Sequence, residues 1–162
     1  MAVVSACDAG PKAWNIEQDQ AGLWYQAKSD RLLYLEKSQN NGFTEYRMVI
    51  AAASPREYPS SQLWLKPDEG SKAGSYTCVD DPRLTVTITG TLLTLRAVNS
   101  DGSFSETWTG VGPGYRQRQL EHYGKAYQRA SAKAANTLED VYQRTRLFVL
   151  INFLKQAKLP QS

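Results

Sequence analysis

The feature that most constrains the fold of this chain is a change of hydrophobic period near residue 114. Before that point, short segments alternate apolar and polar residues, most clearly where Leu84, Val86 and Ile88 alternate with arginine and threonine. Such alternation places one face of a β-strand in the core and the other in water. After residue 114, apolar residues recur every three or four positions, which is the period of an amphipathic helix. The sequence therefore predicts a β unit followed by helices.

Short strands follow one another closely in the part of the chain before residue 110. The segments with strand character are 23–28, 31–37, 43–53, 62–66, 75–79, 83–89, 92–97 and 104–108. Their links are too short for the crossover helix that neighbouring parallel strands require, so we predict an antiparallel sheet. About eight short strands separated by turns indicate a meander, closed as a small barrel or folded as a sandwich. The alternation is the same in both architectures, so both remain open.

Two helices are predicted after the segment 110–114, whose sequence GVGPG is interpreted as a hinge. The first begins at Tyr115, and its apolar face comprises Leu120, Tyr123, Tyr127, Ala130 and Ala134. Thr137 and Asp140 have the spacing of a capping box, which predicts a break near Asn136 and a second helix over 138–157. The stripe predicted to pack this second helix on the sheet consists of Leu138, Val141, Tyr142, Thr145, Phe148 and Val149.

We expect one α+β domain over residues 1–162. It is divided into an arm (1–21), an antiparallel β unit (22–110) and a C-terminal helical segment (115–158) packed on it. A chain of this length can bury a substantial core without disulfides or metals. The longest apolar run, 147–154, is far shorter than the ~18 residues that a membrane-spanning helix needs. It is therefore interpreted as a buried or interfacial helix face.

Charge is divided unevenly along the chain. Residues 1–114 contain 10 Lys and Arg against 13 Asp and Glu, a net of −3, whereas residues 115–162 contain 9 against 3, a net of +6. The helical residues Arg129, Lys133, Arg144 and Arg146 are therefore candidates for binding an acidic protein or anionic lipid headgroups, with a solvated helix face as the alternative. Nucleic acid is not expected, because the excess is spread thinly and no nucleic-acid-binding motif accompanies it.

Aromatic residues are concentrated in the β unit. Trp24, Tyr25, Trp64 and Trp108 are candidates for lining a ligand cavity or a protein-binding face, and the alternative is ordinary core and cross-strand packing. Because successive strand residues point to opposite faces, Trp24 and Tyr25 cannot both lie in the same core layer.

No combination of residues indicates catalysis. His122 is the single histidine, and its neighbour Glu121 would point about 100° away from it on a helix. The acidic pairs Asp68-Glu69 and Asp80-Asp81 stand beside prolines, where acidic residues are good turn formers. The sequence contains no nucleophile elbow, phosphate-binding loop or zinc-protease motif. We therefore expect no catalytic residue, metal or cofactor.

The N-terminal residues Val4-Ser5-Ala6-Cys7 resemble the lipobox of bacterial lipoproteins, whose cysteine becomes lipidated. Since only six residues precede Cys7, the resemblance implies a longer precursor carrying the rest of the signal peptide. It also implies a lipid anchor on Cys7 and a periplasm-facing location in the cell envelope. As alternatives, Cys7 forms a disulfide with Cys78 or stays free, and Cys78 on its own is a small buried apolar residue.

A second resemblance concerns Gly22-Leu23-Trp24, which opens the meander and is similar to the Gly-x-Trp start of lipocalin-like barrels. It implies a carrier of a small apolar ligand. Together the observations favour a non-enzymatic binding protein of the bacterial cell envelope that recognises a protein partner. The alternatives are the lipocalin-like carrier and an enzyme using carboxylates and tyrosines in a β cleft.

Overall fold

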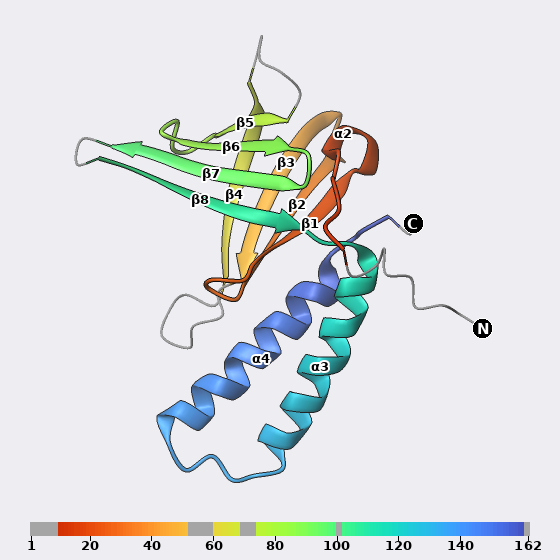
Figure 1. Cartoon of the computed structure of the whole chain (residues 1–162), viewed down its shortest axis with the longest axis vertical. Coiled ribbons are helices and arrows are strands. Elements are labelled where there is room, and N and C mark those ends of the chain that lie inside the picture. Colours follow the sequence, from red (N-terminus) through yellow and green to blue (C-terminus); the bar gives the residue numbers. More distant parts are fainter. Residues whose placement is uncertain (1–9, 52–59, 69–73, 100–101, 161–162) are drawn as a thin grey trace.

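The computed structural model describes residues 10–51, 60–68, 74–99 and 102–160. In this part of the chain, eight antiparallel strands in sequential order close into a barrel, and two long helices leave the barrel as a hairpin (Figure 1). The strands are β1 (Ala21–Gln26), β2 (Arg31–Asn40), β3 (Phe43–Ala51), β4 (Ser60–Pro67), β5 (Ser75–Cys78), β6 (Leu84–Thr89), β7 (Leu92–Asn99) and β8 (Gly102–Gly110). The α+β prediction is confirmed, and the β unit is a barrel rather than a sandwich.

Turn chemistry explains where several strands end. At the tip of the β2–β3 hairpin, Asn41 and Gly42 have φ angles of 52° and 83°, the left-handed conformation that these two residue types adopt most easily. The β1–β2 connection spans residues 27–30, because pairing stops at Gln26 and Arg31, whereas only residues 29–30 separate the predicted segments 23–28 and 31–37. Asp30, at the end of this connection, has a positive φ of 51°.

The second half of the predicted arm has a structure of its own. Asn15 caps the short helix α2 (Ile16–Asp19) by accepting hydrogen bonds from the backbone N–H groups of Glu17 and Gln18. Trp14 and Ile16 are buried and belong to the cluster inside the barrel. No periodic signal marks this helix in the sequence, because one helical turn is too short to show one. In Figure 1, α2 lies at one end of the barrel.

The helical hairpin consists of α3 (Pro113–Ser131) and α4 (Leu138–Gln156). The predicted break between the helices and the capping box of Thr137 and Asp140 are confirmed. The first helix begins two residues before the predicted Tyr115, because Pro113 occupies the first turn, where its missing N–H costs no hydrogen bond. The segment predicted as a hinge therefore includes this helix start.

Two arginines link the helices, and each caps the carboxyl end of the helix opposite its own. Arg116 Nε on α3 donates to the carbonyl oxygen of Leu154 on α4 at 2.7 Å. In return, Arg144 on α4 donates to the carbonyl oxygens of Ala130, at 3.0 Å, and Lys133. Cations suit these positions because the carboxyl end of a helix carries partial negative charge. Part of the basic excess of the helical segment thus stabilises the hairpin itself.

The core has two layers, one on each face of the sheet. Trp24, Leu33 and Leu35 point into the barrel and are fully buried there. The alternate residues Leu23 and Leu32 point outward and are buried under the two helices. Strands β1 and β2 therefore have two covered faces, which explains why residues 32–35 are all apolar.

The prediction of which residues pack α4 on the sheet was wrong. The residues of α4 that are buried are Leu147, Leu150, Phe153 and Leu154. In contrast, Leu138, Val141, Tyr142 and Phe148 of the predicted stripe are exposed. The apolar residues of α4 lie all around its axis, so periodicity alone did not identify which side meets the barrel. In Figure 1 the first half of α4 extends beyond the barrel.

Candidate functional site

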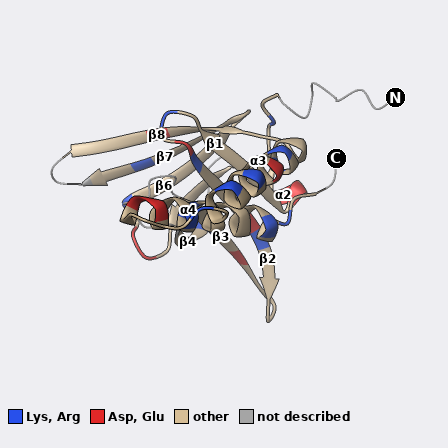
Figure 2. Ribbon diagram, turned by 90° about the horizontal axis from the view of Figure 1, so that it is seen from below, with Lys and Arg blue, Asp and Glu red and all other residues tan. Residues whose placement is uncertain are grey.

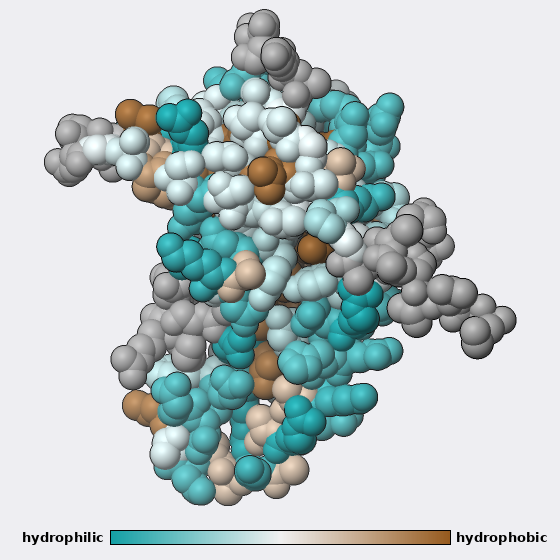
Figure 3. All heavy atoms as spheres, viewed as in Figure 1, coloured by the Kyte–Doolittle hydropathy of each residue, from teal (hydrophilic) through white to brown (hydrophobic). Residues whose placement is uncertain are grey.

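An exposed apolar stripe runs along α4 in the part of the hairpin that projects from the barrel. We call this set the outer stripe, and its side chains, with their exposed fractions, are Leu138 (71%), Val141 (45%), Tyr142 (38%) and Phe148 (55%). Phe148 also contacts α3, with its ring 6.4 Å from that of Tyr127. One face of the molecule is shown in Figure 3, where the hairpin is mostly hydrophilic with a few hydrophobic patches. The outer stripe is the longest row of exposed apolar side chains on any described element.

Three of the four predicted basic residues share one location. Arg129, Lys133 and Arg144 line a groove of about 690 Å³ between the ends of the two helices, together with Asn136 and Asp140. In the view from below in Figure 2, Lys and Arg colour both helices. Arg129 and Lys133 are exposed, whereas Arg144 is held by its capping hydrogen bonds.

Arg146, the fourth predicted basic residue, lies apart from this groove. Its guanidinium pairs with the Asp30 carboxylate at 2.8 Å, which connects α4 to the β1–β2 turn. Tyr25, a predicted binding residue, donates to the same carboxylate at 2.9 Å and packs its ring 5.6 Å from Tyr115. Both residues join the barrel to the hairpin, so the structure gives them a positioning role.

The predicted tryptophans occupy two different environments. Trp24 and Trp108 lie inside the barrel with 0% and 1% of their surface exposed. Neither indole N–H has a hydrogen-bond partner among the described residues. Trp64 is on the outer face of β4 and is 37% exposed. The core interpretation therefore holds for two of the tryptophans, and their free donors face the barrel interior.

Trp14 seals one end of the barrel and explains the Gly-x-Trp sequence. Its indole N–H donates to the carbonyl oxygens of Leu23 and Val111, both at 3.0 Å. A Cβ atom at Gly22 would stand only 2.6 Å from the Trp24 ring and 2.7 Å from the Trp14 ring. Glycine is therefore required at this position so that two tryptophan rings can pack against the backbone of β1.

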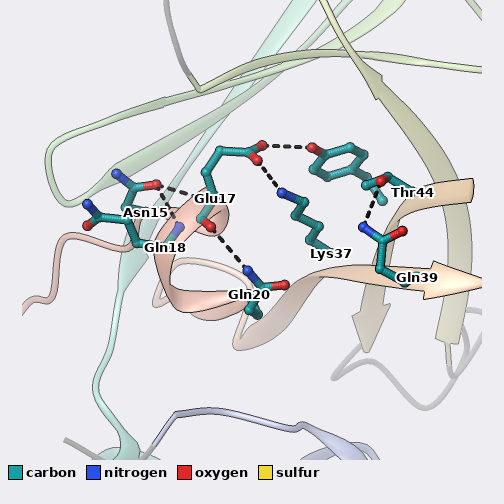
Figure 4. Close-up of polar contacts among 8 residues, drawn as sticks. Asn15, Glu17, Gln18, Gln20, Lys37, Gln39 and Thr44 are labelled. Carbon is teal, nitrogen blue, oxygen red and sulfur yellow. Dashed lines mark hydrogen bonds and ion pairs between the residues drawn. The ribbon is translucent and has the colours of Figure 1, made fainter. Parts of the chain in front are cut away.

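A polar cluster that the sequence did not indicate holds α2 on the barrel (Figure 4). One carboxylate oxygen of Glu17 accepts a hydrogen bond from Tyr46 at 2.8 Å, and the other pairs with Lys37 at 2.7 Å. Tyr76 lies beside Tyr46, with ring centroids 5.3 Å apart. Glu17 is 20 and 29 residues from its two partners, so no local pattern could reveal the cluster.

The pKa shifts in this cluster do not prepare it for acid–base catalysis at neutral pH. Burial alone would raise the pKa of Glu17, but the hydrogen bonds from Lys37 and Tyr46 lower it overall. Burial and the adjacent Glu17 carboxylate raise the pKa of Tyr76 to about 12 and that of Tyr46 further. Each group is therefore held in the form that it already has near pH 7, whereas a general acid or base works best with a pKa near the operating pH.

The other candidate residues have structural surroundings. His122 is exposed on α3, and the side chain of Asp81 binds Arg83 within the β5–β6 turn. Asp68 accepts a hydrogen bond from Thr77, and Glu69 lies outside the described residues. No group of three metal-binding side chains occurs in the described ranges. Nor is any helix described there both long and apolar enough to cross a bilayer.

The two cysteines differ in what the structure shows. Cys78 is a free thiol, 1% exposed, inside the barrel, as expected for a small buried apolar residue. Cys7, the predicted lipidation site, lies outside the described residues. The lipobox resemblance therefore depends on the sequence alone.

Comparison with known proteins adds no family to this description. No family model, no curated protein and no solved structure matches the chain. The functional argument therefore depends on the surfaces and interactions of the chain itself.

Proposed function

We propose that this chain is a non-enzymatic binding protein of the bacterial cell envelope and that its helical hairpin recognises a protein partner. The observation that carries the proposal is the outer stripe, four apolar side chains exposed along α4, three of them on its projecting first half. A helix that meets only water on one side needs no apolar residues there for folding. Rows of exposed apolar side chains bordered by polar ones are typical of protein interaction sites.

The basic groove between the ends of the two helices supports an acidic partner. Arg129 and Lys133 are exposed at the end of α3, close to the start of α4. Rim charges of this kind steer association and select partners, while buried apolar anchors supply most of the affinity. The Glu17 cluster, in which the pKa shifts hold each group in the form that it already has near pH 7, also favours binding over catalysis.

The location in the envelope is part of the proposal and is supported by Val4-Ser5-Ala6-Cys7. A lipid on Cys7 would anchor the chain to a membrane and leave the barrel and the hairpin in the periplasm. Expression of the protein from its own gene in bacteria grown with a labelled fatty acid tests this. Label should appear in the wild type and be absent from a Cys7→Ser variant.

Partner capture from a bacterial envelope extract tests the binding proposal. We expect the wild type to retain a protein that the double variant Val141→Asp, Phe148→Asp does not retain. The matched control Val79→Asp, Phe43→Asp changes the same residue types at exposed barrel positions and should retain the protein. Reversal of Arg129 and Lys133 to glutamate should weaken capture and its dependence on salt. If both double variants retain the protein equally, the outer stripe is not the binding surface.

A lipocalin-like carrier of a small apolar ligand is the second candidate. It is favoured by the unsatisfied indole N–H groups of Trp24 and Trp108 inside the barrel. An eight-stranded barrel is just wide enough to be filled by side chains or to hold one small ligand. Titration with oleate should then shift the tryptophan fluorescence, and Trp108→Phe, which removes one free donor, should weaken binding. An unchanged spectrum at saturating oleate would exclude this candidate for fatty acids.

A further inference from the structure

The barrel closes over only a short stretch between its first and last strands. β8 pairs with β7 from Gly102 to Thr109 in an unbroken register. On its other side, β8 pairs with β1 only through Trp24–Gly110 and Tyr25–Thr109. In the described part of the chain, residues 102–107 of β8 therefore have no strand on the β1 side. Figure 1 shows the β7–β8 hairpin extending beyond β1 and away from the barrel.

Backbone hydrogen-bonding groups face this open side. The carbonyl oxygen of Thr107 accepts a hydrogen bond from the side chain of Gln26 at 3.4 Å, so it points toward β1. The backbone groups of successive strand residues point alternately to the two sides. Ser105 and Ser103, two and four residues earlier, therefore present their N–H and C=O groups to the same open side. Such groups form a template on which another strand can pair.

This edge has few of the features that normally prevent pairing, and its single charged residue, Glu106, lies within 4.0 Å of Arg31. Residues 102–107, with the sequence GSFSET, contain no proline, lysine or arginine, and the continuous register with β7 leaves no room for a bulge. Phe104 is 47% exposed in the middle of the segment. Val98, on the opposite face of the same hairpin, is 55% exposed. The hairpin thus combines free backbone groups with exposed apolar side chains.

We propose that two copies of this chain pair through β8, antiparallel, about a two-fold axis at Phe104. In that register Phe104 stands opposite its counterpart, and Ser103 of each copy stands opposite Ser105 of the other. The serine pairs would exchange backbone hydrogen bonds, because their groups face the edge. The phenylalanines would form the intervening pair, in which side chains approach most closely. The result is a four-stranded sheet built from two β7–β8 hairpins.

A two-fold axis at Phe104 suits this edge better than an axis at another residue of β8. A two-fold axis requires a self-complementary segment, and this register places Glu106 opposite Gly102, so no like charges face each other. A centre closer to Thr107 would press the second strand against the β1–β2 turn. That turn and Ser105–Thr107 line a groove of about 460 Å³. Because each copy contributes one short strand, we expect a weak, concentration-dependent dimer.

Sedimentation equilibrium over a concentration series tests the pairing. The wild type should move from monomer toward dimer as concentration rises to the order of 1 mM, the range in which weak interfaces form. Phe104→Lys places like charges at the two-fold axis and should remain monomeric. The control Phe43→Lys makes the same change at a 74% exposed phenylalanine on another hairpin and should behave as the wild type. A wild type that stays monomeric, or a Phe104→Lys variant that still dimerises, overturns the proposal.

Disulfide trapping tests the register independently. In a Cys7→Ser background the remaining cysteine, Cys78, is buried and free. Phe104→Cys should form an intermolecular disulfide on mild oxidation, since directly opposite residues in this type of pair are close enough for one. Phe43→Cys should not. Equal cross-linking of the two variants would indicate random collision and contradict the register. The double variant Val141→Asp, Phe148→Asp on α4 should leave the dimer intact. This proposal and the proposed function can therefore be contradicted independently of each other.

Discussion

Both halves of α4 carry apolar side chains, but these side chains differ in what surrounds them. The second half contributes Leu147, Leu150 and Leu154 to the core under the barrel. The first half contributes Leu138 and Val141 to the surface. The difference arises because only the second half lies over the outer faces of β1 and β2. An apolar stripe on a helix thus predicts that something covers it, without saying whether the cover belongs to the same chain.

The largest expected effect distinguishes the buried and exposed halves directly. Leu150→Ala removes a side chain that is 0% exposed and should lower the free energy of unfolding by about 2–5 kcal/mol, because it loses buried contacts and leaves a cavity. Val141→Ala, on the same helix but 45% exposed, should change it by less than about 0.5 kcal/mol. Urea denaturation measures both. Equal losses would mean that the outer stripe already packs against part of this chain.

Two glycines extend the comparison from side chains to backbone. Gly22→Ala forces a Cβ atom against the Trp14 and Trp24 rings and should cost about 1–3 kcal/mol. At Gly124, on α3, a Cβ atom would meet no other atom within 4 Å. Gly124→Ala should therefore raise the free energy of unfolding by about 0.5–1 kcal/mol, since alanine favours the helix. Thermal unfolding of both variants tests whether the two substitutions change stability in opposite directions. A loss of stability in Gly124→Ala would show that the space beside Gly124 in the helical hairpin is occupied.

Local patterns were sufficient for much of this fold. Alternation identified the strands, and the spacing of Thr137 and Asp140 located the start of α4, because these features depend on residues only a few positions apart. Closure into a barrel could not be predicted, since it depends on pairing between β1 and β8, about 85 residues apart in the chain. Helix α2 was missed because its burial depends on the barrel end that it covers.

The candidate sites also divide into features that depend on neighbouring residues and features that depend on distant ones. Arg129 and Lys133 were correctly expected on the surface, because charged helix residues usually stay in water. Arg144 and Arg146 were grouped with them, but their partners, Ala130 and Asp30, are set by the packing of distant elements. The Glu17 cluster and the open edge of β8 are likewise products of tertiary structure, so nothing in the order of residues could reveal them.

A smaller effect concerns the start of the exposed half of α4. Thr137 accepts a hydrogen bond from the backbone N–H of Asp140, and Thr137→Ala should cost about 1 kcal/mol through loss of the cap. Thr145→Ala provides the control, because its hydroxyl bonds back to the Val141 carbonyl oxygen in mid-helix, where such a bond adds little. Hydrogen exchange of the α4 amides should locate the loss in the first turns. Uniform exchange changes along α4 would show that its two halves unfold together.

The smallest effect is the pH dependence of the α2 cluster, where the barrel end can be compared with the hairpin. The pKa of Glu17 is lowered in the folded state, because the hydrogen bonds from Lys37 and Tyr46 outweigh burial. Its contribution to stability is therefore present above the unfolded pKa, near 4.5, and is lost as the pH falls through the lower folded value. Glu17→Gln should reduce the difference in urea midpoint between pH 7 and pH 3. Glu121→Gln, on the solvent face of α3, should leave that difference nearly unchanged. If the two variants behave alike, the acid sensitivity of this protein does not arise from the contacts of Glu17 with Lys37 and Tyr46.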